Sequence, residues 1–599
     1  MGDIVEKIAA TFAIIDRSDR GEAWITVSDI EQATAAAERV EQRRDAGGHL
    51  PLAGITVAVK DNIDVAGLPT TAACPAFMSH PVEDAPAVAS LIQAGAVVVG
   101  KTNMDQFATG LVGTRSPYGA VRNARIPRYI SGGSSSGSAV AVALGQVDLA
   151  LGTDTAGSGR IPAAFNGIVG LKPTRGLVSI RGTVPACSSL DCISIFAPTA
   201  TLSRRALEII AAVDPADPWQ RADRTSWGNP PRMVRSVGIP DPDQLDLSQT
   251  SRELFAAAVA RLETLGARIE VVDISALLEA GQLLYGGALV AERYAAVGEF
   301  VAHHRTQIDP SVAETILAAE GIPAHRLASD LAHLARLRLT TTTLFEKVDA
   351  IILPSAPFHP LIEEVRADPI ALNEQLGRFS FFCNPLDLCA ITVPAGQTSE
   401  GLPWGITVYA PRFADRALTD LGSAFLDENA PDPDTSRAGP SRPAIGIARR
   451  QLVVAGAHLR GQPLNAELIA VGGEFVEQTT TSAVYRLYRL DGTPAKPALV
   501  WSGDDGCAIE VEIWSFDDEG FAQLVSHIPP PMAVGPIELV ARRWVPGFVC
   551  QPAALTHGLD ISGHGGWCAY LASVATAATG ISAGEPSNAD PPWASTTCR

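Results

Sequence analysis

The feature that most constrains the fold of this chain is the alternation, in its first 430 residues, of short apolar runs with segments of helical periodicity. Residues 26–44, for example, carry apolar side chains at positions 30, 33, 37 and 40, the spacing of one helix face. We predict strands at 55–59, 96–99, 149–152, 268–272, 350–354, 390–394 and 404–409. We predict helices at 4–15, 26–44, 84–95, 103–109, 137–144, 203–213, 252–265 and 415–426, and a helical region over 274–347. Such alternation predicts an α/β sandwich around a mostly parallel or mixed sheet.

The pattern changes after a stretch rich in proline, aspartate and serine at 427–444. We therefore place a first domain at 1–430, a linker at 431–446 and a small, mainly β second domain at 447–575. Its predicted strands are 451–455, 483–490, 497–501, 507–516 and 537–541. Residues 576–599 are small and polar, and we expect a disordered tail there.

Composition excludes several classes of function. The chain has 599 residues and a formal net charge of −19, which argues against a nucleic-acid partner. Its nine cysteines form no C-x-x-C pair, which favours free thiols in a reducing compartment over a disulfide framework. The histidines form no metal-binding motif, so we expect neither a metal nor another cofactor.

The start of the chain and its apolar runs predict a cytoplasmic protein with no membrane contact. Residues 1–6 lack the basic start and apolar core of a signal peptide. The longest apolar run, 139–151, is too short to cross a bilayer and is interrupted by Asp148.

Three short segments carry the residues of a serine hydrolase. Lys60 ends V-A-V-K, Ser134 lies in S-G-G-S-S-S-G-S-A, and Ser158 lies in G-T-D-T-A-G-S-G-R. A serine hydroxyl is a weak nucleophile until a base takes its proton, and a lysine is such a base only when burial or positive neighbours keep it neutral. The apolar run before Lys60 predicts that burial.

Each element alone has an ordinary structural explanation. A single lysine at a strand end usually extends its amine to the surface, and a Ser/Gly cluster is usually a flexible loop or a phosphate-binding nest. The glycine-rich loop has no following lysine and so does not fit the P-loop pattern. The occurrence of all three together favours a Ser-Ser-Lys catalytic unit.

In order and wording the three segments resemble the amidase signature family. The resemblance implies an α/β/α sandwich with a large twisted mixed sheet, and hydrolysis of an amide bond. It implies a cis peptide before Ser134, whose hydroxyl relays a proton between Ser158, the nucleophile, and Lys60. It also implies an oxyanion hole formed by the N–H groups of Thr155, Ala156 and Gly157.

A closer resemblance, to the allophanate hydrolases, rests on four further segments. These are T-T-A-A-C-P-A (70–76), K-T-N-M-D-Q-F-A-T-G-L-V-G-T-R-S-P-Y-G (101–119), L-K-P-T-R-G (171–176) and V-V-A-G-A-H-L-R-G-Q-P-L-N (453–465). The resemblance implies that allophanate is the substrate and that ammonia and N-carboxycarbamate are the products. It also implies that Tyr285 and Arg293 bind the substrate.

Tyr285 and Arg293 stand eight residues apart, so on a continuous helix both would lean toward one side. The structural alternative is a packing tyrosine and a surface arginine paired with Glu292. The intervening Gly286-Gly287-Ala288 is less bulky than the resemblance leads us to expect, which would loosen the helix or widen the pocket.

The second domain resembles the γ-glutamyl cyclotransferase-like fold of allophanate hydrolases, which implies decarboxylation of N-carboxycarbamate to carbamate and carbon dioxide. A proton donor is needed, and His458 and His557 are the candidates, with His564 a weaker one. Glu510 and Glu512 would polarise a histidine. The alternative for each histidine is an ordinary core or loop residue.

Two other functional hypotheses stay open at this point. One is an amidohydrolase of broader range acting on small amides. The other makes the second domain an assembly module that forms a homodimer or docks a urea carboxylase.

Overall fold

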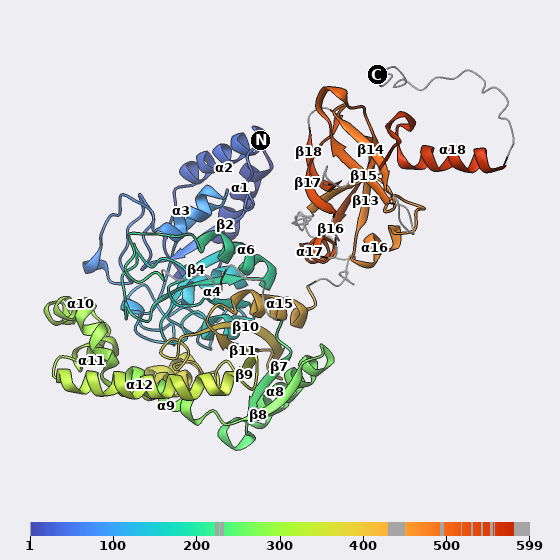
Figure 1. The fold of residues 1–599 in the computed structure, drawn as a ribbon. Helices are drawn as coiled ribbons and strands as arrows, with labels where there is room; N and C mark the ends of the chain where they lie inside the picture. The colour runs from blue at the N-terminus through green and yellow to red at the C-terminus, as the bar shows by residue number, and fades with distance from the viewer. Residues whose placement is uncertain are drawn as a thin grey trace. The chain divides into compact units, whose positions relative to one another are not determined.

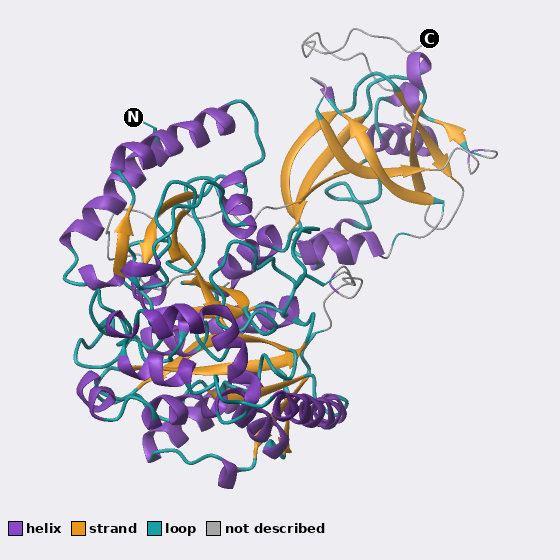
Figure 2. Ribbon diagram, turned by 90° about the vertical axis from the view of Figure 1, so that its left-hand side faces the viewer, coloured by secondary structure: helices purple, strands orange, loops and turns teal. Residues whose placement is uncertain are grey.

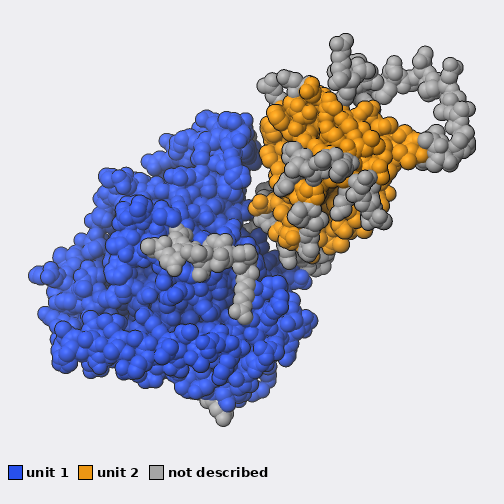
Figure 3. All heavy atoms as spheres, in the orientation of Figure 1, with its two compact units in different colours: residues 1–432 blue, residues 433–599 orange. Residues whose placement is uncertain are grey.

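The computed structural model divides into two compact units, residues 1–432 and residues 433–599 (Figure 3). It describes residues 2–221, 227, 233–428, 450–490, 496–516, 518–526, 528, 531–540, 543–550, 555 and 558–579. The predicted linker, most of the predicted tail and His557 lie outside the described residues.

Unit 1 is built on one mixed sheet of 11 strands in the order β1-β3-β2-β4-β6-β5-β10-β11-β9-β7-β8 (Figure 1). The strands are β1 (Trp24–Val27), β2 (Thr56–Lys60), β3 (Val97–Thr102), β4 (Leu149–Asp154), β5 (Val169–Lys172), β6 (Cys192–Ala197), β7 (Ser236–Pro240), β8 (Arg268–Val272), β9 (Ala350–Pro354), β10 (Leu388–Gln397) and β11 (Pro403–Pro411). β2 pairs in parallel with β3 and β4, and β7 pairs in parallel with β8 and β9. The remaining pairs are antiparallel, so the expected large mixed sheet is confirmed.

Helices cover both faces of this sheet because its central strands are apolar on both sides. Val57 and Val59 belong to the larger core, with residues of α3 and α6, whereas Ala58 belongs to a second core with residues of α1, α2 and α4. The helices are α1 (Asp3–Arg17), α2 (Ile30–Asp45), α3 (Pro86–Gln93), α4 (Ser136–Ala143), α5 (Ile161–Asn166), α6 (Ala200–Ile210), α8 (Gln249–Thr264), α9 (Ser275–Tyr285), α10 (Ala291–His303), α11 (Pro310–Leu317), α12 (Ala324–Phe345), α13 (Ile362–Ala367), α14 (Ala371–Leu376) and α15 (Asp415–Leu426).

Three helix predictions need correction. The helix expected at 103–109 is wrong, because only the short 3-10 turn Gln106–Ala108 forms and Phe107 has a φ of 52°. The helix expected at 203–213 begins at Ala200 instead, because the side chain of Thr199 caps it. The helix expected from residue 26 begins only at Ile30, and the residues before it form β1.

Strands dominate the second unit (Figure 2). One sheet has the order β13-β16-β12-β18-β17 and a smaller sheet has the order β15-β14-β19, around a shared apolar core. The elements are β12 (Arg450–Val454), α16 (Asn465–Ala470), β13 (Glu474–Thr480), β14 (Tyr485–Leu490), β15 (Lys496–Trp501), β16 (Glu510–Phe516), α17 (Asp518–Ser526), β17 (Met532–Glu538), β18 (Trp544–Cys550), β19 (Leu559–Asp560) and α18 (Trp567–Thr579). This confirms a small C-terminal β domain. Among the described helices none has the length and apolarity needed to cross a membrane.

Candidate active site

Lys60, Ser134 and Ser158 form one hydrogen-bonded line. Lys60 Nζ lies 2.8 Å from Ser134 Oγ, and Ser134 Oγ donates to Ser158 Oγ at 3.0 Å. All three side chains are buried. The structure therefore brings together the three residues that the sequence singled out.

The central sheet and two loops position this line. Lys60 is the last residue of β2, and Ser158 lies in the loop that follows the neighbouring strand β4. Ser134 precedes α4, and the Gly133–Ser134 peptide bond is cis, as expected. A Cβ on Gly133 would lie 2.1 Å from the Asp105 carboxylate, so glycine is needed for this close approach.

Burial controls the charge of Lys60. Its pKa falls to about 7 because the amine is removed from water, although the carboxylates of Asp105, Asp154 and Asp191 oppose this shift. The amine also donates to Thr153 Oγ1 at 2.7 Å, which fixes its direction. Near neutral pH a large fraction of the molecules therefore carries Lys60 in its neutral form, which is the form that can accept a proton.

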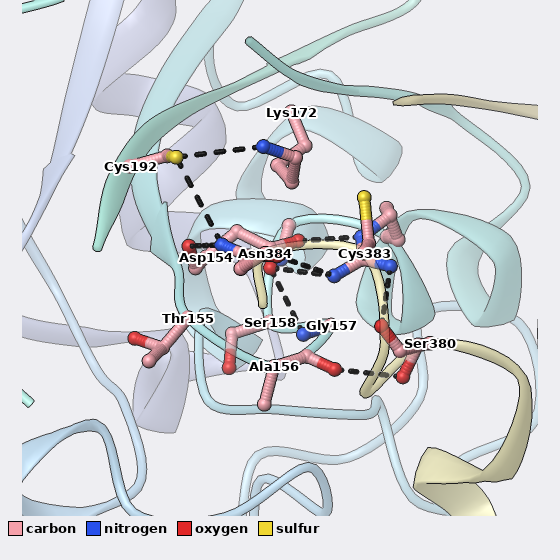
Figure 4. Close-up of polar contacts among 12 residues, drawn as sticks. Asp154, Thr155, Ala156, Gly157, Ser158, Lys172, Cys192, Ser380, Cys383 and Asn384 are labelled. Carbon is pink, nitrogen blue, oxygen red and sulfur yellow. Dashed lines mark hydrogen bonds and ion pairs between the residues drawn. The ribbon is translucent and has the colours of Figure 1, made fainter. Parts of the chain in front are cut away.

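A buried ion pair fixes the loop that carries Ser158. Both Asp154 and Arg160 are fully buried, and Arg160 Nη2 donates to Asp154 Oδ1 at 2.8 Å. The same carboxylate accepts the N–H groups of Gly157 and Gly159, each at 2.9 Å. Figure 4 shows Gly157 and Ser158 on this loop beside Asp154. The N–H of Gly157, predicted for the oxyanion hole, thus has an internal acceptor in this structure.

Gly157 itself is required by the local geometry. Its φ is +143°, and a Cβ would lie 2.4 Å from Ser380 Oγ. Ser380 in turn donates to the carbonyl of Ala156 at 2.8 Å (Figure 4). The hydroxyl of Thr155 donates to the buried carboxylate of Asp191, which also accepts the N–H of Ala186 at 2.9 Å. Contacts on both sides therefore hold the backbone of Thr155, Ala156 and Gly157.

Tyr285 and Arg293 meet, but not on a continuous helix as expected. α9 ends at Tyr285, and α10 begins only at Ala291, because the chain turns at Gly286 and Gly287. The turn still brings Arg293 Nη2 to within 2.9 Å of the Tyr285 hydroxyl.

Arg293 is buried and has neutral partners. Its Nη1 donates to Thr109 Oγ1 at 3.1 Å, and its Nε has no hydrogen-bond partner in the described part of the chain. Glu292, the partner considered for a surface arginine, instead accepts the hydroxyl of Ser189 at 2.5 Å. A buried guanidinium without a carboxylate partner is suited to a bound anion.

Comparison with known proteins agrees with this geometry. The Amidase family model matches residues 8–419, and the Allophanate hydrolase C-terminal domain model matches residues 450–572. The chain belongs to the amidase family. It combines the amidase domain with an allophanate hydrolase C-terminal domain, as the allophanate hydrolases do.

Relatives of known structure include a serine-to-alanine variant of the Kluyveromyces lactis allophanate hydrolase. It is 36% identical, with a TM-score of 0.70, over 96% of this chain and 97% of that one. Urea amidolyase of Lachancea kluyveri is 38% identical over 584 residues, which is 92% of this chain but 31% of the relative. The chain thus spans about a third of the length of these urea amidolyases. A glutamyl-tRNA(Gln) amidotransferase subunit of Natronomonas pharaonis is 36% identical over 63% of this chain and 96% of that protein.

The described histidine candidates of the second unit, His458 and His564, contact different partners and form no hydrogen-bonded line with each other. His458 Nε2 lies 3.4 Å from Glu467 Oε2, and burial lowers the pKa of His458. His564 is exposed, and its ring lies 5.4 Å from that of Tyr570. His557 lies outside the described residues.

Glu510 and Glu512, expected to polarise a histidine, contact other side chains. Glu512 accepts from Arg460 Nε at 3.0 Å and from Trp514 Nε1 at 3.1 Å. Glu510 accepts from the side-chain amide of Gln478. These contacts give no support to a pair between a histidine and Glu510 or Glu512, and the glutamate that His458 contacts is Glu467.

Sequence reasoning does not find the residues that support the catalytic line: Thr153, Asp105, Asp191 and the Asp154–Arg160 pair. Asp154 and Arg160 both lie in the motif around Ser158, so oppositely charged residues on either side of a glycine-containing turn could have indicated this ion pair. Asp105 accepts the N–H groups of Gly113 and Arg115, at 3.0 and 2.9 Å. No short sequence motif predicts such a contact.

Proposed function

We propose that this protein hydrolyses allophanate to ammonia and N-carboxycarbamate through a serine acyl-enzyme. The observation that carries the proposal is the buried line from Lys60 through Ser134 to Ser158. The two-domain match to the allophanate hydrolases supports the choice of substrate. A broader small-amide hydrolase is the less supported alternative.

In this mechanism the neutral Lys60 amine takes the proton of Ser134, which takes that of Ser158. Ser158 Oγ then attacks the carbonyl carbon of the terminal amide. The negative oxygen that forms is bound by the N–H groups of Thr155 and Ala156, and by that of Gly157 once it leaves Asp154. Each such donor contributes about 3 to 4 kcal/mol to transition-state stabilisation.

Collapse of this intermediate breaks the C–N bond. The proton held by Lys60 returns through Ser134 to the departing nitrogen, which leaves as ammonia. Water then attacks the acyl-enzyme carbonyl through the same relay and frees Ser158. Protons are conserved over the cycle, so no cofactor is called for.

Arg293 and Tyr285 select the substrate in this proposal. The carboxylate of allophanate meets the buried Arg293 guanidinium, whose present partners are neutral oxygens. A neutral amide gains less from the same contact, because charge-assisted hydrogen bonds are about twice as strong as neutral ones.

For the second unit we propose assistance in the decarboxylation of N-carboxycarbamate, with His458 or His557 as proton donor. The alternative is an assembly module. A homodimer, an association with a urea carboxylase and a cytoplasmic location remain proposals. Deleting residues 445–599 separates the two roles. Slower carbon dioxide release supports decarboxylation. An unchanged rate together with fewer chains per particle on sizing supports assembly.

The test of the primary function is ammonia release from allophanate beside malonamate, biuret and urea, in wild type and Ser158→Ala. Ammonia from allophanate that is lost in the variant supports the nucleophile and the substrate together. Turnover of the other amides with allophanate untouched retains the chemistry and rejects the substrate. A folded Ser158→Ala protein with substantial activity rejects the mechanism.

A further inference from the structure

A cavity of about 270 Å³ borders the loop 186–191, whose Asp191 also accepts the Thr155 hydroxyl. The lining residues that matter here are Arg175, Ser188, Ser189, Asp191, Trp219 and Arg221. All of its lining residues are within the described part of the chain, and Ser158, Tyr285 and Arg293 are not among them. The proposed reaction therefore does not use this cavity.

Four arginines from separate segments gather beside the cavity around one carboxylate. Arg175 Nε lies 3.7 Å from Asp387, Arg221 pairs with the same carboxylate, and Arg412 Nη1 lies 3.3 Å from it. Arg338 donates to a backbone carbonyl, and burial together with Arg175 lowers its pKa. Three arginines thus pair with Asp387 and a fourth lies near it, while Asp191 is the one carboxylate among the described lining residues of the cavity.

The two arginines that line the cavity, Arg175 and Arg221, each have N–H donors that their contacts within the described residues do not use. Arg175 Nη1 donates to the carbonyl of Ser189 at 2.7 Å, and Arg221 Nε donates to the carbonyl of Arg175 at 2.6 Å. Within the described residues, Nη2 of Arg175 and Nη1 of Arg221 donate no hydrogen bond. Ser188, Ser189 and Trp219 line the same space, and the Ser189 hydroxyl already donates to Glu292.

We propose that this cavity is a second anion site, which binds a small, doubly charged oxyanion such as a dicarboxylate. Paired guanidinium groups match the two oxygens of a carboxylate or phosphate. The hydroxyl of Ser188, which lines the same cavity, supplies a further donor for a ligand oxygen.

The cavity shares a wall with the active site. Asp191 lines it and at the same time accepts the Thr155 hydroxyl, and Ser189 is bound by Glu292, the neighbour of Arg293. A dianion held there contacts the segment that orders the Ser158 loop. The N-carboxycarbamate of the proposed reaction is such a dianion; this identity rests on the proposed function, whereas the site itself does not.

The experiment is calorimetric titration of the full chain with malonate, which is not hydrolysed. Two sites are expected, one at Arg293 and one in the cavity. Arg221→Gln should weaken the cavity site at least about tenfold, since a charge-assisted pair is lost, and leave the other unchanged. Arg293→Gln should do the reverse. The matched control is Arg412→Gln, which contacts the same Asp387 but does not line the cavity, and which should retain both sites.

The fluorescence of Trp219 provides a second measurement if Arg221→Gln does not fold. Its malonate-dependent change should persist in Arg293→Gln and disappear in Trp219→Phe. Inorganic phosphate that displaces malonate from the cavity assigns the site to oxyanions in general, and weak displacement assigns it to dicarboxylates. A single malonate site that vanishes in Arg293→Gln, with no Trp219 response, overturns the proposal. None of these readouts depends on ammonia release, so loss of the proposed activity would not be mistaken for loss of this site.

Discussion

Lowering the pH should protonate Lys60 and stop the reaction. Because the pKa of Lys60 is about 7, the neutral fraction of the amine falls from about nine tenths near pH 8 to about one tenth near pH 6. The base is active only when neutral, so kcat/KM is retained above the pKa and is lost as the pH falls through it. We expect a decrease of about tenfold over this range.

Thr153→Val tests whether this acid limb belongs to Lys60. Thr153 Oγ1 accepts from Nζ at 2.7 Å and so favours the charged amine. Losing a hydrogen bond of about 1 kcal/mol should lower the pKa by about 0.7 units and move the limb to lower pH. The assay is kcat/KM for a neutral amide, beside inactivation by a neutral sulfonyl fluoride whose own charge does not change. A limb that stays in place in Thr153→Val, or a flat profile down to about pH 5.5, refutes the reasoning.

Three further substitutions test the site. Gly157→Ala should lower kcat by about 10²- to 10³-fold, because the new Cβ would lie 2.4 Å from Ser380 Oγ and displace the oxyanion loop. Asp154→Asn should lower the free energy of unfolding by about 3 to 5 kcal/mol in chemical denaturation, because it leaves Arg160 charged and unpaired in the interior. Arg293→Gln should raise KM for allophanate more than for a neutral amide in steady-state assays.

Matched controls accompany the first two. Gly145→Ala meets a φ of +64° but open space, so it should cost stability and leave kcat near wild type. Glu400→Gln removes the exposed partner of Arg128, and its effect on unfolding should stay below about 1 kcal/mol. A catalytic loss in Gly145→Ala as large as in Gly157→Ala, or equal destabilisation by Glu400→Gln and Asp154→Asn, would count against these explanations. Equal KM changes for both substrates would remove Arg293 from carboxylate binding.

Much of the sheet could be predicted from local pattern. The strands expected at 268–272 and 350–354 coincide with β8 and β9. Residues 350–354 are a continuous apolar run, and in 268–272, R-I-E-V-V, β-branched residues follow a charged–apolar alternation. The local pattern does not predict β5 and β6. β5 has only four residues, V-G-L-K, whose composition does not predict a strand. The strand forms because it pairs with β6 and β10 on either side.

The sequence predicts those parts of the candidate site in which the chemistry requires a particular residue type. It does not predict those parts whose geometry depends on contacts with residues far away in the chain. A base and two hydroxyls in glycine-rich loops point to one another, and the structure brings Lys60, Ser134 and Ser158 together. The two glycines after Tyr285 indicate a loosened helix, but the outcome depends on Asp330, whose carboxylate accepts the N–H of Ala288 at 2.7 Å from 42 positions away. No window of local sequence contains that information.

The proposed base, Lys60, and the proposed substrate-binding residue, Arg293, are anchored in different parts of unit 1. Lys60 ends a strand in register with two neighbours, where a shift of one residue would turn its amine to the opposite face and abolish turnover. Arg293, by contrast, lies on a helix that follows a glycine turn outside the sheet. Insertions or exchanges near that turn can therefore retune which amide is accepted while the proton relay stays intact. Directed evolution of new substrates should accordingly start between α9 and α10 and leave β2 and β4 untouched.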